Sequence, residues 1–106
     1  MSNLGLDWEK VKRERGRLVI LRALAEQVDG SLDSRTIEDF VLPPFNINED
    51  RVWINEQLDY LGKRGAVIVT EAGSVKIATL TKHGRRHLTR AVAIEGVLRP
   101  SEPEGL

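Results

Sequence analysis

The feature that most constrains this chain is the stretch 48–88, in which apolar periodicity changes from helical to extended and back again. Ile54, Leu58 and Leu61 recur at intervals of four and three residues, and Ile47 stands seven residues before Ile54. This spacing predicts a helix with a single apolar stripe that faces the core. The sequence offers short polar caps at its start and glycines at its end, namely Asn48 or Asp50 and then Gly62 and Gly65.

The residues that follow predict a β-hairpin and then another helix. Residues 66–70 are too few for a helix and are rich in β-branched side chains, which favours a strand. Residues 71–74 include a glycine and have the length of a hairpin turn, so residues 75–80 are the predicted partner strand. Thr81 is placed to cap a new helix that begins in residues 82–88.

The N-terminal half predicts two more helices joined by a short strand. Residues 7–28 have apolar side chains at helical spacing, and Gly16 predicts a kink or a break there. Residues 31–32 are the predicted strand, and a short helix follows until Pro43 stops it. The expected buried faces are Trp8, Val11, Leu18, Leu21, Ala25 and Val28 on the first helix, and Ile37, Phe40 and Val41 on the second.

These elements predict an α+β fold, mainly α, with three to four helices and a two- or three-stranded β-wing. Residues 59–67 (DYLGKRGAV) and 80–85 (LTKHGR) resemble the Leu-x-x-x-Gly-x-(Leu/Val), hairpin, Leu-Thr-x-x-Gly pattern of winged helix-turn-helix regulators of the ArsR and MarR type. The chain as a whole is similar to small winged-helix proteins of Mu-like prophages, over roughly residues 15–100. The resemblance implies one winged-helix domain over 1–98, with 1–14 as a helical extension in one reading. The prolines, glycines and acidic residues near the end of the chain predict an extended or disordered tail over 99–106.

Composition narrows the protein class further. The chain has 106 residues, enough for one domain with a modest core, and it has no cysteine for disulfides or thiolate zinc sites. We find no apolar run of membrane-spanning length and no signal-peptide pattern near the start. The expectation is a cytoplasmic protein that does not bind membranes.

The net charge of zero conceals a separation of charge along the chain. Residues 1–22 carry six basic and three acidic groups, whereas residues 23–75 carry four basic and ten acidic groups. Residues 76–90 then carry five basic groups and no acidic one, and residues 91–106 carry one basic and three acidic groups. The predicted recognition helix therefore lies in the acidic middle of the chain.

The resemblance implies a transcriptional regulator that binds double-stranded DNA. In that reading the third helix presents Arg51, Val52, Asn55 and Glu56 to a groove, where arginine pairs with guanine and asparagine with adenine. The wing contributes Ser74 and Lys76, and the basic groups that hold the DNA backbone are Lys12, Arg13, Arg17, Lys82, Arg85 and Arg86. Four carboxylates of the same region argue against this reading, because phosphates repel them: Glu49, Asp50, Glu56 and Asp59.

The alternative is a protein-interaction module, such as a phage adaptor, that uses the acidic third helix without binding specific DNA. A fold does not fix a function, and an acidic face suits a basic partner. Tryptophans often anchor interfaces, which makes Trp53 a candidate contact. A homodimer is also expected, joined through apolar residues near the two ends: Leu4, Leu6, Trp8, Val97 and Leu98.

Enzymatic and metal-binding patterns are weak. His83 and His87 are four residues apart and would share a helix face, but arginines surround them and no third ligand is close in sequence. We therefore expect a solvated or dimer-contacting pair rather than a metal site. The sequence predicts no cofactor and no catalytic residue.

Overall fold

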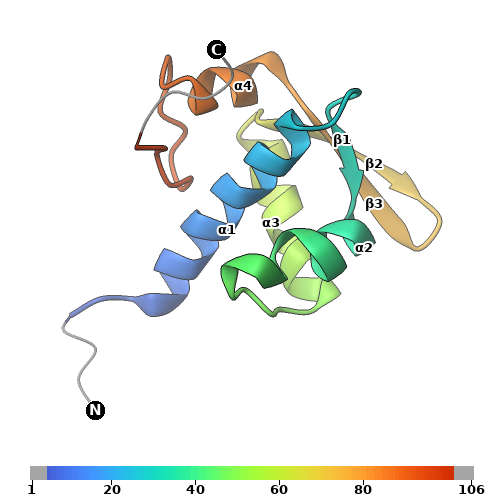
Figure 1. Cartoon of the computed structure of the whole chain (residues 1–106), viewed down its shortest axis with the longest axis horizontal. Helices are drawn as coiled ribbons and strands as arrows, with labels where there is room; N and C mark the ends of the chain where they lie inside the picture. Colours follow the sequence, from blue (N-terminus) through green and yellow to red (C-terminus); the bar gives the residue numbers. More distant parts are fainter. Residues whose placement is uncertain (1–4, 102–106) are drawn as a thin grey trace.

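The third helix, α3 (Arg51–Lys63), is the central element of the structure, a computed structural model that describes residues 5–101 (Figure 1). Its N-cap is Asp50, whose Oδ1 accepts the Trp53 N–H at 3.0 Å. Ile54, Leu58 and Leu61 have no exposed surface, which confirms the predicted stripe. The predictions for Leu4 and for residues 102–106 lie outside the described residues.

The architecture is mainly helical α+β, as predicted. In Figure 1 α1 lies across α3, the sheet lies beside them, and α4 lies near the C-terminal end of α3. The other elements are α1 (Trp8–Ala25), β1 (Ser31–Asp33), α2 (Ser34–Thr36), the π-helical turn η1 (Ile37–Val41), the 3₁₀ turn η2 (Pro43–Phe45), β2 (Val67–Ala72), β3 (Val75–Leu80) and α4 (Lys82–Leu88).

The sheet has three antiparallel strands in the order β1-β3-β2. The predicted hairpin is confirmed: β2 pairs with β3 from Val67 opposite Leu80 to Ala72 opposite Val75. Gly73 has a φ of +62° at the first turn position, a conformation that glycine adopts without steric cost. The predicted short strand also forms, because β1 pairs with β3.

The first helix differs from its predicted face. Trp8, Val11 and Val28 are largely exposed, and the buried part of α1 comprises Gly16, Arg17, Leu18, Val19, Ile20, Leu21 and Leu24. The predicted break at Gly16 is wrong, since α1 runs from Trp8 to Ala25 as one helix. A Cβ at Gly16 would lie 3.1 Å from the Trp53 ring, so the glycine permits the close packing of α1 on α3.

The second helical segment is shorter and less regular than predicted. After one turn, α2 widens into η1, in which the Leu42 N–H donates to the Ile37 carbonyl five residues back. A π turn changes the angular spacing of side chains, so the predicted face fails at Phe40, which is 73% exposed. Leu42 is buried instead, and Pro43 begins η2.

The C-terminal segment packs against the helices. The predicted fourth helix ends at Leu88, and Arg90 adopts a positive φ of 66° that redirects the chain. Ile94, Val97 and Pro100 are then buried, so the part of the predicted tail at Pro100 belongs to the packed structure. Between residues 5 and 101, none of the helices combines the length and apolar character needed to cross a bilayer.

Candidate functional site

The outward face of α3 is the surface that the sequence assigned to DNA recognition. Val52, Glu56 and Asp59 are exposed on this face. Arg51 is not free to contact DNA, because its Nε donates to Glu38 Oε1 on η1 at 2.6 Å. The outward face of α3 is therefore acidic and apolar from Val52 to Asp59, Lys63 is exposed in the last turn, and Arg51 is held by a neighbouring carboxylate.

The hairpin cation is also paired. Lys76 Nζ lies 3.0 Å from Glu71 Oε2 and 3.4 Å from Asp59 Oδ1. The hydrogen bond with Glu71 is the main reason that the pKa of Lys76 is raised. Ser74 is exposed at the hairpin tip, as a wing contact would require. The ion pair of Lys76 with Asp59 connects the hairpin to α3. One lysine thus lies beside two carboxylates, those of Asp59 and Glu71.

Asn55 does not present a complete amide to solvent. Its Oδ1 is buried and has no hydrogen-bond partner among the described residues. Recognition of adenine uses both the oxygen and the nitrogen of an asparagine amide. The predicted base contact by Asn55 would therefore require its side chain to rotate.

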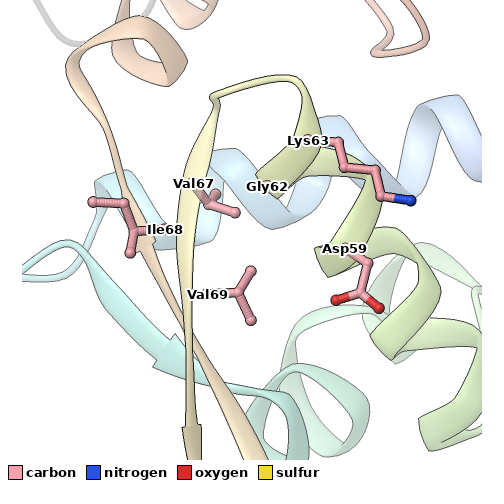
Figure 2. A pocket seen from close by; sticks show the side chains of 6 residues that line it. All are labelled: Asp59, Gly62, Lys63, Val67, Ile68 and Val69. Atoms are coloured by element: carbon pink, nitrogen blue, oxygen red, sulfur yellow. The ribbon is translucent and has the colours of Figure 1, made fainter.

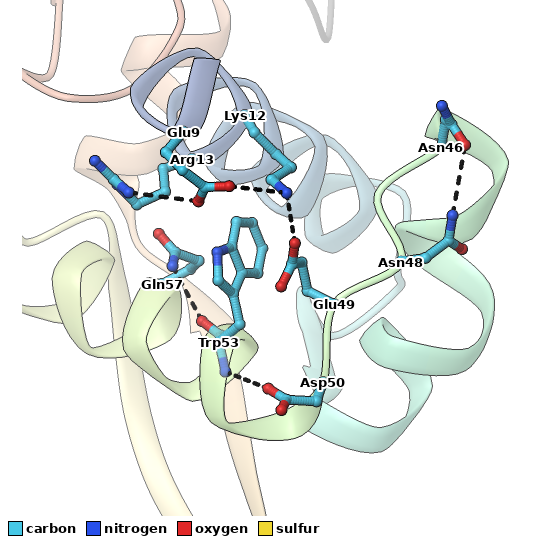
Figure 3. A network of polar contacts seen from close by, with 9 residues as sticks. All are labelled: Glu9, Lys12, Arg13, Asn46, Asn48, Glu49, Asp50, Trp53 and Gln57. Atoms are coloured by element: carbon cyan, nitrogen blue, oxygen red, sulfur yellow. Dashed lines mark hydrogen bonds and ion pairs between the residues drawn. The ribbon is translucent and has the colours of Figure 1, made fainter. Parts of the chain in front are cut away.

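Lys12 and Arg13, two of the predicted DNA-backbone contacts on α1, pair with carboxylates. Figure 3 shows Lys12 between Glu9 and Glu49, with Arg13 Nη1 at 3.7 Å from Glu9 Oε1. The hydrogen bond with Glu49 is the largest cause of the raised pKa of Lys12. The pair of Lys12 with Glu49 joins α1 to the segment that leads into α3, and the pairs with Glu9 lie within α1.

Arg17 was predicted as a DNA-backbone contact, and the structure shows that this prediction is wrong. Only 8% of Arg17 is exposed. Its Nε donates to Gln57 Oε1 at 2.9 Å, its Nη1 donates to the Gly96 carbonyl at 2.8 Å, and its guanidinium stacks 3.7 Å from the Tyr60 ring centroid. Burial lowers the pKa of Arg17, and the side chain serves to join α1, α3 and the C-terminal segment.

The predicted basic residues of α4 remain exposed. Lys82, Arg85 and Arg86 form no ion pair within residues 5–101, and we call these three residues the α4 basic cluster. The helix starts beside the C-terminal end of α3, where the Thr81 N–H donates to the Ala66 carbonyl at 3.1 Å. Since α3 is about 20 Å long, the cluster lies far from Arg51.

The two histidines have different environments. His83 is exposed, whereas His87 has no exposed surface, so the prediction of a solvated or dimer-contacting pair is wrong for His87. His87 Nδ1 accepts the Ile94 N–H at 3.0 Å, which makes Nε2 the N–H donor to the Leu98 carbonyl at 3.0 Å. Both ring nitrogens hold the C-terminal segment in place. No group of three metal-ligating side chains gathers within the described chain.

The predicted interface residues divide into two groups. Leu6, Trp8 and Leu98 are 46%, 55% and 45% exposed, so each is accessible to a partner. Trp53 and Val97 are buried, and their predicted role as contacts is wrong. Trp53 packs between α1 and α3, and Val97 fills the core next to α4 because the C-terminal segment turns back.

Two surface grooves were not predicted. One, which we call the α3–β2 groove, has a volume of about 470 Å³ and is lined by Asp59, Gly62, Lys63, Val67, Ile68 and Val69 (Figure 2). The other lies between α1 and the turns η1 and η2, and it contains both phenylalanines of the chain, Phe40 and Phe45. The prolines beside Phe45 were a signal for an irregular turn, but the widening at η1 has no clear mark in the sequence.

Comparisons of this chain with known protein families, with curated proteins and with solved structures found no match.

Proposed function

We propose that this chain is a winged helix that works as a protein-interaction module, and that its acidic α3 surface binds a basic segment of another protein. The order of a long helix, a short helical segment, a central helix and a hairpin supports the winged-helix assignment. The observation that carries the functional proposal is the pairing of the two cations that were predicted to contact DNA here, Arg51 with Glu38 and Lys76 with Glu71 and Asp59.

Electrostatics favour a basic partner over DNA at this surface. Phosphate neutralisation by free lysines and arginines supplies much of the affinity of DNA-binding proteins. At the start of α3 and on the hairpin, Arg51 and Lys76 are held by carboxylates, and Lys63 at the end of α3 is the exposed exception among the described residues. Glu56 and Asp59 remain exposed. A DNA backbone would have to break the existing pairs and approach the remaining carboxylates, whereas lysines or arginines of a protein would add favourable contacts.

The exposed phenylalanines give independent support for a protein partner. Phe40 and Phe45 are 73% and 41% exposed and line one groove with Val41 and Pro44. Small proteins seldom leave aromatic residues exposed together unless another molecule covers them. The module thus has, in addition to its acidic surface, a groove lined by these phenylalanines and by polar side chains of α1 and the residues just after it, among them Arg22 and Gln27.

The second candidate is DNA binding through the α4 basic cluster. The exposure of Lys82, Arg85 and Arg86 favours it specifically. Contacts of this kind reach phosphates and carry no sequence information. This function would be salt-dependent and indifferent to Arg51.

Selection from a library of displayed random peptides tests the main proposal. We expect enriched peptides to carry lysine or arginine, and the combined variant Glu56→Gln, Asp59→Asn to reduce their binding. A matched control is Asp29→Asn with Glu95→Gln, which removes two exposed carboxylates outside this surface and outside the groove of the phenylalanines. Enrichment of acidic peptides, or equal loss in both combined variants, would refute the proposal.

Homodimer formation stays a prediction. With Trp53 and Val97 buried, its remaining apolar contacts are Leu6, Trp8 and Leu98. A cytoplasmic location and a prophage origin also stay predictions. Sedimentation of the chain at micromolar concentration as a single monomeric species would refute the homodimer.

A further inference from the structure

The strand β2 has a free edge. The sheet order β1-β3-β2 gives β2 only one neighbour. In an antiparallel pair, alternate residues direct their main-chain groups toward the partner and the others direct theirs away. The bond from the Thr81 N–H to the Ala66 carbonyl shows which residues of β2 direct their main-chain groups toward β3. The main-chain groups that point toward β3 are those of residues 66, 68, 70 and 72. The N–H and C=O groups of Val67, Val69 and Glu71 therefore point outward.

The bonds on the far side of β3 agree with this assignment. The Leu80 N–H donates to the Gly30 carbonyl at 2.8 Å, and the Lys76 N–H donates to Ser34 Oγ at 3.1 Å. The main-chain groups of even-numbered residues of β3 therefore point toward β1, and those of odd-numbered residues point toward β2. The odd-numbered residues of β3 pair in the register with Ile68, Thr70 and Ala72 of β2.

Only part of this edge is accessible. Val67 is 3% exposed beside the end of α3, whereas Val69 is half-buried and Glu71 is exposed. The accessible edge is therefore the segment from Val69 to Ala72. It adjoins the α3–β2 groove at Val69, and Figure 2 shows β2 on one side of this groove and Asp59 and Lys63 of α3 on the other.

The usual protections of a free edge are weak here. Natural edge strands often carry proline, an inward-pointing charge or a bulge that prevents another strand from pairing. The β2–β3 register continues from Val67 to Ala72 without a bulge, and residues 67–70 are all β-branched. Ile68, which points away from α3, is 62% exposed. This strand has the geometry of a template for one more strand.

We propose that an extended, basic peptide segment of a partner protein adds to the sheet beside β2 as a fourth strand. This inference rests on the proposed function and gives it a binding mode. The main-chain groups of Val69 and Glu71 bond to the added strand. Its alternate side chains point either into the groove toward α3 or toward the face of Ile68.

Charge along the groove defines the peptide further. Asp59 and Glu71 both pair with Lys76, which places these two carboxylates at the hairpin end. Lys63 lies one helical turn beyond Asp59, toward the level of Val67. The peptide therefore carries a lysine or arginine toward Asp59, a neutral or acidic residue toward Lys63, and apolar side chains on the Ile68 face.

The direct test is amide hydrogen exchange on the full chain with a synthetic peptide that has a single lysine, acetyl-Thr-Val-Thr-Val-Lys-Val-Thr-amide. We expect exchange at Val69 and Glu71 to slow by about tenfold or more on binding, since their N–H groups gain acceptors. Ile68 and Thr70, already bonded within the sheet, should change little. A matched peptide with glutamate in place of lysine should produce neither effect.

Two variants separate strand addition from simple contact. Val69→Pro removes an outward N–H that β3 does not use, and proline is tolerated at such edge positions. Val69→Ala shortens the side chain and keeps the N–H. We expect peptide affinity to fall about five- to tenfold in the proline variant relative to the alanine variant, the effect of losing one hydrogen bond.

The outcomes distinguish the two proposals. Peptide binding without protection of Val69 and Glu71, or with equal affinity in both variants, refutes strand addition and leaves the acidic surface as a binding site. Absence of binding by the lysine peptide in exchange, combined with failure of the peptide selection, refutes the proposed function itself. The exchange measurement uses the unmodified chain, so it remains decisive if Val69→Pro does not fold.

Discussion

Two polar regions of this protein use similar residues for different purposes. Around the C-terminal segment, Arg17, Tyr60 and His87 are wholly or largely buried and bonded: Tyr60 Oη donates to the Glu95 carbonyl at 2.8 Å, and Arg17 and His87 bond to residues 94–98. At the α3 and β2 surface, carboxylates are exposed and a strand edge is open. Buried polar groups need internal partners, so the first region serves the fold. The second region retains capacity to bind another molecule.

The largest expected effect is at Gly96, in the buried region. A Cβ there would overlap the Tyr60 hydroxyl, and the φ of +81° disfavours any other residue. We predict that Gly96→Ala lowers the free energy of unfolding by about 2–4 kcal/mol. The loss in the free energy of unfolding is measured by urea unfolding monitored through tryptophan fluorescence.

The matched control for that substitution is Gly73→Ala in the hairpin. Gly73 also has a positive φ, +62°, but a Cβ there meets nothing within 4 Å. Its expected cost is about 1–2 kcal/mol, from backbone conformation alone. Equal losses in the two variants would contradict the packing of the C-terminal segment against Tyr60.

The next largest effect contrasts two arginines. Arg17→Met leaves Gln57 Oε1 and the Gly96 carbonyl without their donor, so we predict a loss of about 2 kcal/mol in the free energy of unfolding. Arg51→Met breaks a partly exposed ion pair with Glu38 and should cost less than about 1 kcal/mol. Thermal unfolding of both variants at one pH tests the contrast, and a reversed order would overturn it.

A smaller effect concerns Asp33, whose carboxylate caps α2. Its Oδ1 accepts the Thr36 N–H at 2.8 Å, and this bond is the main cause of its lowered pKa. Because the folded-state pKa lies below the unfolded one, the stabilisation is present above the usual carboxyl value of about 3.9 and is lost as pH falls through the lowered value. We predict that Asp33→Ala costs about 1 kcal/mol at pH 7.

The isosteric variant provides the pH test. Asp33→Asn keeps an acceptor for the Thr36 N–H but cannot ionise. The difference in unfolding free energy between it and the natural chain should therefore shrink as pH falls below about 3.9. A difference that stays constant from pH 7 to pH 2 would show that the ionised carboxylate is not the source.

The smallest stability effect, with a gain in binding, is expected at Lys76. Its ion pairs with Glu71 and Asp59 are exposed, so Lys76→Met should leave the unfolding curve unchanged within error. The substitution also frees two carboxylates, and we expect affinity for the lysine-containing peptide to rise about two- to fivefold. Isothermal titration measures this, and weaker binding would count against the acidic surface as the site.

Regular periodicity made the central elements predictable from the sequence. Ile54, Leu58 and Leu61 indicated α3 and its buried face, and the β-branched runs around Gly73 indicated the hairpin. These signals are local, since each depends on spacing within one element.

The side-chain environments were less predictable because they depend on contacts between distant segments. Arg17 looks like any surface arginine in sequence, and its burial requires Gln57 and Gly96, which lie 40 and 79 residues away. His87 and Val97 are buried for the same reason, since the chain turns back after Arg90. The exposure of Phe40 follows from the π turn.

Whether the α3 surface binds protein rather than DNA is tested by the fluorescence anisotropy of a labelled random-sequence DNA duplex, titrated with the protein at several salt concentrations. We compare the natural chain with Arg51→Ala and with the combined variant Arg85→Ala, Arg86→Ala. We predict that any binding is salt-dependent, is weakened by the combined variant and is unchanged by Arg51→Ala. A loss of about tenfold or more with Arg51→Ala would contradict this prediction, because the α3 surface would then be contacting DNA.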